Sequence, residues 1–182
     1  MLLLGVCNPA GEASSYNGLY FKQNELEDMV AQRALINVPV KAEHSGADVG
    51  RVCSAFLNHT GAMSCLIEVP ETTFRGTLVA NLVRDKVALD LSMGYSVDVQ
   101  HSKESCQDKK RLTAGKKRTL EISLVRKGAR EGCHIMAYED NNGKCLWREP
   151  KVPKINVSTQ KVASYSKDFE RFFAKSRVFN QK

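Results

Sequence analysis

Residues 49–69 read VGRVCSAFL-NHTG-AMSCLIEV and contain the clearest structural signal in this chain of 182 residues. Two apolar runs, 49–57 and 62–69, flank the segment Asn58-His59-Thr60-Gly61. Runs of this length on either side of a glycine-containing turn predict a β-hairpin. The two cysteines inside the runs, Cys53 and Cys65, are compatible with strands because a free thiol behaves as a small hydrophobe.

Other strands and helices are predicted on both sides of this hairpin. Apolar or alternating runs predict strands over 1–6, 36–42, 87–99, 118–125 and 133–138. Helical spacing of apolar residues predicts helices over 25–34, 71–86 and 167–178. For the first helix we expect a capping box of Asn24 and Glu27. For the second we expect an entry through Thr72 or Thr73 and an apolar face with Phe74, Leu78 and Leu82, with Val79 and Val83 beside them. These elements predict an α+β fold, a mostly antiparallel and partly closed β-barrel surrounded by helices.

Length and composition fit one globular domain with a real core, since 42% of the residues are hydrophobic. We expect the domain over residues 1–150. After Pro150 the composition shifts, and 151–182 are predicted to be a linker and a C-terminal helix, either packed on the same domain or forming a dimer contact. The apolar runs are too short to span a bilayer, and the first six residues are too short for a signal peptide, so no membrane association is expected.

The net charge is +7, and residues 103–130 and 148–182 hold most of the basic residues. Such stretches either bind a polyanion or are a solvated loop and a solvated tail. The lysine and arginine runs at 109–111 and 116–118 contain no interleaved aromatic residues, which favours the solvated interpretation. The alternative function from this pattern is a non-catalytic basic β-barrel that binds nucleic acid through the clusters at 109–111 and 116–118, with affinity that falls steeply with salt.

The six cysteines, at positions 7, 53, 65, 106, 133 and 145, show no C-x-x-C spacing. The sequence therefore predicts no metal site and no cofactor, and we expect reduced thiols. A cysteine nucleophile stays open, although no local pattern favours any of the six.

Three residues have the chemistry of a hydrolytic triad, each with an ordinary alternative. His44 follows a strand among small and polar neighbours, which suits an accessible general base or an ordinary loop histidine. Ser92 precedes Gly94 at a break in a strand, which suits a presented nucleophile or an ordinary strand serine. Glu121 interrupts an apolar strand, so it either faces solvent or orients a histidine.

The turn Gly128-Ala129-Arg130-Glu131-Gly132 follows the Glu121 strand. It is either a reverse turn with a solvated arginine or a source of backbone N–H groups and a fixed cation for an oxyanion.

The order of these motifs resembles the capsid-maturation serine proteases, namely the herpesvirus assemblins and the tailed-phage prohead proteases. Residues 38–44 (VPVKAEH) and 48–52 (DVGRV) resemble the segment around the first catalytic histidine of the assemblins. Residues 91–95 (LSMGY) and 121–125 (EISLV) are similar to two strands of the prohead enzymes, and 128–132 (GAREG) to the glycine- and arginine-rich turn of the assemblins. Two departures are Glu121, where assemblins have a second histidine, and Ala129, where they have the first of two arginines.

The resemblance implies a serine endopeptidase with Ser92 as nucleophile, His44 as base and Glu121 as the third member of the triad. It implies an oxyanion site at Ala129 and Arg130. The expected substrate is the internal scaffold protein of an immature viral capsid, cut near small residues, together with the protease's own precursor. We expect a homodimer that acts in the host nucleus and the capsid interior, or in the host cytoplasm if the virus is phage-like.

Overall fold

The computed structural model describes residues 1–11, 19–97, 117–140, 143 and 145–147. These residues belong to one unit, Met1–Lys151. The predicted basic loop at 100–116 and the predicted linker and helix in 151–182 lie outside the described residues. Neither helix of the described part is both long and apolar enough to cross a membrane.

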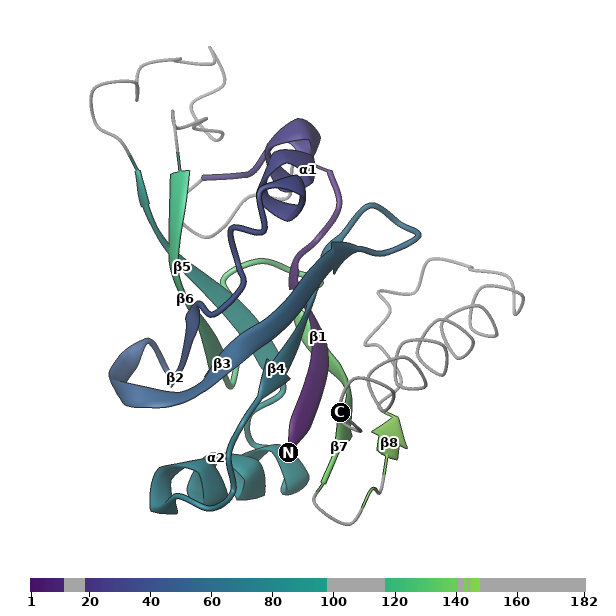
Figure 1. The fold of residues 1–182 in the computed structure, drawn as a ribbon. Coiled ribbons are helices and arrows are strands. Elements are labelled where there is room, and N and C mark those ends of the chain that lie inside the picture. The colour runs from purple at the N-terminus through teal and green to yellow at the C-terminus, as the bar shows by residue number, and fades with distance from the viewer. Residues whose placement is uncertain (12–18, 98–116, 141–142, 144, 148–182) are drawn as a thin grey trace, which may run out of the picture. The chain divides into compact units, whose positions relative to one another are not determined.

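Eight strands form one sheet in the order β5-β6-β2-β3-β4-β1-β7-β8 (Figure 1). Neighbouring strands are antiparallel with one exception in the described sheet, the parallel pair β2–β6. The strands are β1 (Leu2–Asn8), β2 (Pro39–Ala42), β3 (Ser45–Leu57), β4 (Met63–Glu68), β5 (Asp90–Val97), β6 (Lys117–Val125), β7 (His134–Glu139) and β8 (Cys145–Trp147). The expected mostly antiparallel sheet is therefore confirmed, and β8 is a strand that the sequence pattern did not predict.

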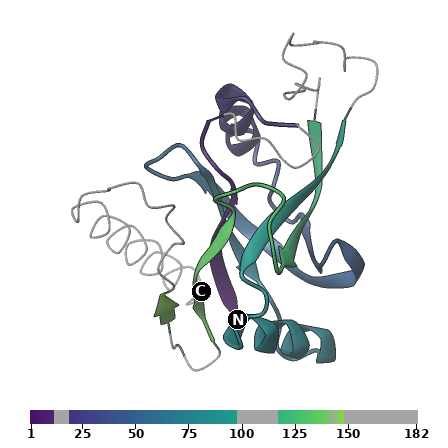
Figure 2. The ribbon, with the colours of Figure 1, turned by 180° about the vertical axis from the view of Figure 1, so that it is seen from behind.

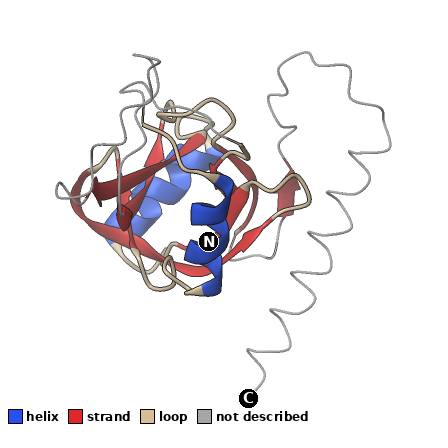
Figure 3. Ribbon diagram, turned by 90° about the horizontal axis from the view of Figure 1, so that it is seen from above, coloured by secondary structure: helices blue, strands red, loops and turns tan. Residues whose placement is uncertain are grey.

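The sheet curls until its edge strand β5 meets β1 and β7, as the view along the barrel shows (Figure 3). The backbone N–H of Ile135 donates to the carbonyl of Leu89 across this closure, at 2.9 Å. Gly5 makes the close approach possible, because a Cβ at this position would lie 2.6 Å from Cδ1 of Leu91. The predicted partly closed barrel is confirmed, and apolar residues from β1 to β7 fill its interior.

The predicted hairpin is formed by β3 and β4 (Figure 2). Asn58 closes its turn: the side-chain oxygen Oδ1 accepts hydrogen bonds from the backbone N–H groups of Thr60 and Ala62, at 2.9 and 3.0 Å. Asparagine is suited to this role because its short side chain can replace a backbone acceptor in a turn.

The first helix, α1 (Gln23–Ala31), buries Leu26 and Met29 against the core. The expected capping box of Asn24 and Glu27 is wrong. The helix begins earlier, and the carboxylate of Glu25 accepts from the backbone N–H of Lys22 at 2.7 Å. The acidic residue that satisfies the helix start is thus two positions before the predicted one.

The second helix, α2 (Phe74–Arg84), begins at Thr73, whose hydroxyl accepts from the N–H of Gly76 at 3.0 Å. The two helices lie at opposite ends of the half-barrel (Figure 1). The predicted apolar face of α2 is confirmed in part, because Val79 and Val83 are buried and Leu82 packs partly buried against the core. It is wrong for Phe74 and Leu78, which are 85% and 52% exposed. The fully buried residues, namely Gly76, Val79, Ala80 and Val83, form one helical stripe, and Phe74 and Leu78 belong to another.

Substitutions on the two stripes of α2 should differ in their cost. Val83→Ala should lower the free energy of unfolding by about 2 kcal/mol because Val83 is buried in the core. Phe74→Ala should change it by less than about 0.5 kcal/mol, because its ring is in solvent. Urea denaturation of the two variants measures both, and a larger loss for Phe74→Ala would contradict the observed face of α2.

Candidate active site

The face of β5, β6 and β2 that points away from the barrel interior holds a row of polar residues. Core side chains alternate along these strands, namely Leu91, Met93, Ile122, Leu124 and Val40. The residues between them therefore face outward, since side chains in a strand alternate between two faces. Ser92 pairs with Ser123, and Ser123 pairs with Lys41, so these three residues lie side by side across three strands.

His44 lies in the turn that joins β2 to β3. Ala42 pairs with Ser45, so the loop has two residues, Glu43 and His44, and both have positive φ angles, 50° and 58°. Two positive φ angles give a hairpin turn that matches the strand twist, but they are unfavourable for residues other than glycine and asparagine. The two residues therefore form a tight turn at the end of β2 that is followed directly by β3, so the histidine has a fixed position.

The turn is attached to the end of β6. The N–H of Glu43 donates to the carbonyl of Leu124 at 3.0 Å, and the N–H of His44 donates to the hydroxyl of Ser123 at 3.2 Å. The Glu43 carboxylate accepts from the N–H of Arg126 at 3.0 Å. These bonds extend the parallel pairing of β2 with β6 and hold the strained turn in place.

The imidazole of His44 contacts Glu121, with 2.6 Å between Nδ1 and the carboxylate oxygen Oε1. The His44 side chain is 44% exposed, whereas that of Glu121 is 11% exposed. Glu121 therefore contacts a histidine and does not face open solvent. The contact leaves the second imidazole nitrogen, Nε2, for other partners.

Two local features direct Glu121 to this face. Leu120 has no partner on β5, since Gly94 pairs with Glu121 and Tyr95 with Thr119. This β-bulge reverses the alternation, so that Glu121 faces outward while Thr119 is buried. Gly94 gives the carboxylate room, because a Cβ there would lie 2.6 Å from Cγ of Glu121. The space left by the missing side chain of Gly94 is thus occupied by the side chain of Glu121.

Ser92 lies next to this pair without touching it. It is the cross-strand neighbour of Ser123, whose hydroxyl contacts both Glu121 and the backbone of His44. Ser92 is 3% exposed, and among the described residues its hydroxyl has no hydrogen bond to His44. The structure thus brings His44 and Glu121 into contact. Ser92 lies on the same face of the sheet, and Ser123 lies between it and this pair.

The turn at 128–132 packs beside the beginning of β5. The N–H of Gly128 donates to the carboxylate of Asp90 at 2.9 Å, two residues before Ser92. Ala129 and Arg130 therefore lie in a turn that is fixed next to the strand with the candidate nucleophile.

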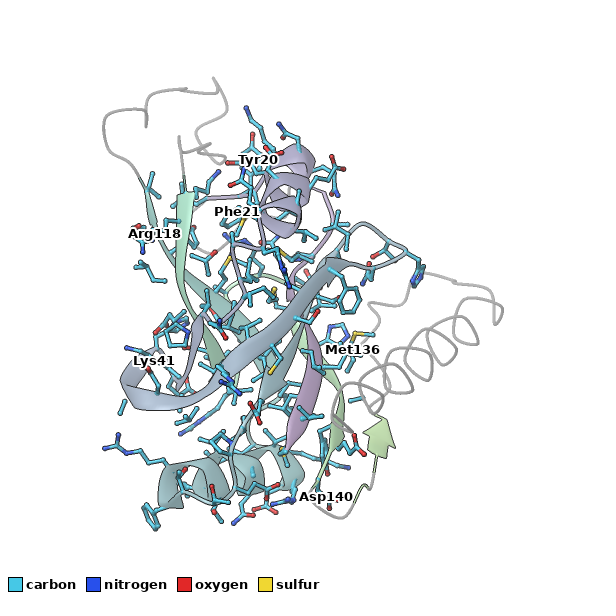
Figure 4. All side chains as sticks on the ribbon, viewed as in Figure 1. Tyr20, Phe21, Lys41, Arg118, Met136 and Asp140 are labelled. Atoms are coloured by element: carbon cyan, nitrogen blue, oxygen red, sulfur yellow. The ribbon has the colours of Figure 1, made fainter. Side chains whose placement is uncertain are left out.

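The guanidinium of Arg130 has a different position from the one expected for an oxyanion cation. The residue is 3% exposed, and its Nη2 donates to the Tyr95 hydroxyl at 3.3 Å and to the Leu19 carbonyl at 3.4 Å. It also stacks over the rings of Phe21 and Tyr95, at 5.2 and 5.5 Å from their centroids. Phe21 lies beside α1 (Figure 4), so the side chain of Arg130 joins the turn to the α1 end of the barrel.

Two residues of the site were not identified from the sequence. Ser123 donates its hydroxyl proton to Oε1 of Glu121 at 3.0 Å. The ammonium of Lys41, labelled on β2 in Figure 4, lies 3.8 Å from the other carboxylate oxygen. Ser123 could have been found from the two-residue period that places it on the Glu121 face. Lys41 could have been identified only if the parallel pairing of β2 with β6 had been known.

The cysteines whose side chains are described are free and poorly suited to nucleophilic catalysis. Burial raises the pKa of the Cys133 thiol, and a hydrogen bond with Cys65 together with burial raises that of Cys7. Burial also raises the pKa of Cys53. A raised pKa keeps the thiol protonated, and the thiolate is the reactive form. These three thiols are therefore not activated.

Part of the basic cluster at 116–118 is used inside the fold. The Lys117 side chain is 2% exposed, and its ammonium contacts both carboxylate oxygens of Glu25, at 2.6 and 2.8 Å. It also lies 4.9 Å from the centroid of the Phe21 ring. Arg118 remains at the outer side of β6 (Figure 4), and residues 109–111 lie outside the described part. Within that part, no group of three His, Cys, Asp or Glu residues could hold a metal ion.

Among solved structures, this half-barrel with helices at its ends has a fold similar to that of KSHV protease in complex with a hexapeptide phosphonate inhibitor, with a TM-score of 0.50 and 16% sequence identity. The match covers 76% of this chain and 65% of the KSHV chain, so this chain spans less than two thirds of that protein. No protein-family model and no curated protein matches the sequence. At this identity the comparison shows the fold alone.

Gly94→Ala should destabilise the protein because the new methyl group overlaps Glu121. We expect a loss of about 1–3 kcal/mol in the free energy of unfolding, typical of overpacking. In a Glu121→Ala background the same change should cost less than about 0.5 kcal/mol, because the overlapping atoms are gone. Urea denaturation of the four proteins in this cycle measures the coupling, and equal costs in both backgrounds would contradict the packing of Glu121 over Gly94.

Arg130→Ala should lower the free energy of unfolding by about 2–3 kcal/mol, because it removes a buried cation from two aromatic rings. Arg126→Ala is the matched control in the same turn region. The Arg126 side chain is 79% exposed, so its removal should cost less than about 0.5 kcal/mol. Equal small losses for the two variants in urea denaturation would mean that Arg130 is an ordinary solvated residue.

Proposed function

We propose that this protein is a serine endopeptidase in which Ser92 is the nucleophile, His44 the general base and Glu121 the orienting carboxylate. The observation that carries the proposal is the 2.6 Å contact between Nδ1 of His44 and Oε1 of Glu121, on the face of the sheet that also bears Ser92. A carboxylate on Nδ1 is the arrangement that leaves Nε2 of a histidine free to exchange a proton with a serine hydroxyl. The protease-like fold supports the same conclusion.

The reaction follows from these positions. Ser92 attacks the carbonyl carbon of the scissile peptide bond while Nε2 of His44 takes the hydroxyl proton. Glu121 stabilises the resulting imidazolium through Nδ1. His44 returns the proton to the leaving amine, and a water molecule, activated by the same histidine, releases the acyl group from Ser92.

The oxyanion of the tetrahedral intermediates would be bound by backbone N–H groups of Ala129 and Arg130. Their turn is anchored beside Ser92 by the bond from Gly128 to Asp90. Preorganised N–H donors stabilise charge that exists only in the transition state. In this proposal the Arg130 side chain has a structural role, since its guanidinium is held by Tyr95 and Leu19.

For the biological role we propose maturation of a viral capsid. The substrates would be the internal scaffold protein and the precursor of the protease itself, and the active form would be a homodimer. The host nucleus and the capsid interior are the proposed sites of action, with the host cytoplasm as the site if the virus is phage-like. The order of the motifs around His44, Ser92 and Glu121 motivates this role.

Ser92→Ala and His44→Ala should each reduce kcat by at least about a thousandfold, because members of a triad act as one unit. Glu121→Gln should reduce it by a smaller factor, since His44 would still be present but less well oriented. Cleavage of quenched-fluorescent peptides with alanine at the cleaved position measures these rates.

Ser96→Ala is the matched control, because Ser96 lies on the same strand and is exposed. It should cleave the peptides at the parent rate. Loss of cleavage in Ser96→Ala together with normal cleavage in Ser92→Ala would overturn the assignment of the nucleophile.

A further inference from the structure

Ser123 makes two hydrogen bonds that connect the base to its orienting carboxylate. Its hydroxyl donates to Oε1 of Glu121 at 3.0 Å and accepts from the backbone N–H of His44 at 3.2 Å. The residue is completely buried. A serine hydroxyl has one proton to donate and lone pairs to accept, so these two bonds use both of its functions.

The backbone of His44 needs such a partner. Its φ of 58° is unfavourable for a residue with a side chain, and a backbone N–H without an acceptor would destabilise the turn further. The Ser123 hydroxyl satisfies this N–H and at the same time limits the positions of the Glu121 carboxylate. One side chain therefore fixes both ends of the His44–Glu121 contact.

The bonding of Ser123 also distinguishes its role from that of a nucleophile. Its proton is directed at a carboxylate rather than at an imidazole nitrogen. Ser92, its neighbour on β5, has no such bond to Glu121 among the described residues. The two adjacent serines therefore differ in their hydrogen bonds, because the Ser123 hydroxyl is bound to Glu121 whereas the Ser92 hydroxyl has no bond to Glu121 or His44 among the described residues.

We propose that Ser123 is a positioning residue that sets the orientation of the His44 imidazole through Glu121 and through the His44 backbone. This inference rests on the proposed function as a serine endopeptidase. It extends the triad to a fourth residue that contacts neither the substrate nor the reacting atoms.

Ser123→Ala should lower kcat by up to about a hundredfold, the effect expected when a catalytic group is misplaced by a short distance. KM should stay within about twofold, because the hydroxyl does not contact the substrate. Ser123→Thr keeps a hydroxyl group at this position and should therefore retain much of the kcat that Ser123→Ala loses. Ser64→Ala, a buried serine in β4 that lies away from the site, is the matched control and should keep the parent kcat.

A second measurement does not depend on activity. The proton on Nδ1 of His44, held by Glu121, should give a downfield proton NMR signal in the parent chain labelled with nitrogen-15. Ser123→Ala should shift or broaden this signal, while Ser64→Ala and Ser123→Thr should keep it. A parent-like signal and a parent-like kcat in a folded Ser123→Ala protein would overturn the positioning role. Absence of Ser92-dependent cleavage in the parent would instead reject the proposed function, and the NMR comparison would still test the position of His44.

Discussion

The parallel pairing of β2 with β6 is the constraint on which the site depends. It places Lys41 beside Ser123 and continues into the bond from Glu43 to Leu124, so the turn after β2 must end beside β6. Without this pairing His44 would be a residue in an exposed hairpin turn. With it, the imidazole lies 2.6 Å from a carboxylate that comes 77 residues later in the chain.

The site also requires that the Glu121 side chain faces outward. A β-bulge and a glycine in the β5–β6 pair meet this requirement. The bulge at Leu120 turns the carboxylate outward, and Gly94 leaves the space that it occupies. The same bulge turns Lys117 inward, where it pairs with Glu25 and lies over Phe21. The β-bulge at Leu120 therefore separates two parts of β6: Lys117 pairs with Glu25 inside the barrel, and Glu121 belongs to the row of polar residues on the outward face. Arg130 adds a further link between this interior and the turn beside Ser92.

Much of the fold could be predicted because the signals are local. The hairpin of β3 and β4 follows from two apolar runs and a turn, and the start of α2 follows from Thr73. The buried face of α2 could be predicted only in part: Val79 and Val83 are buried as expected, whereas Phe74 and Leu78 are exposed because packing selects the stripe that also contains Gly76 and Ala80. His44 and Glu121 could be nominated by residue type, but their contact depends on a long-range pairing. The position of the Arg130 side chain likewise depends on Phe21 and Tyr95, which are distant in sequence.

We propose that the outward face of β5, β6 and β2 is a serine-protease site with Ser92 as its nucleophile. Reaction of the full chain with a fluorophosphonate, followed by mass mapping of the adduct, tests this proposal most directly. We expect one adduct, on Ser92, and no adduct when His44 is replaced by alanine in a folded protein. An adduct on Ser123 or Ser96, or a folded parent protein that does not react, would contradict it.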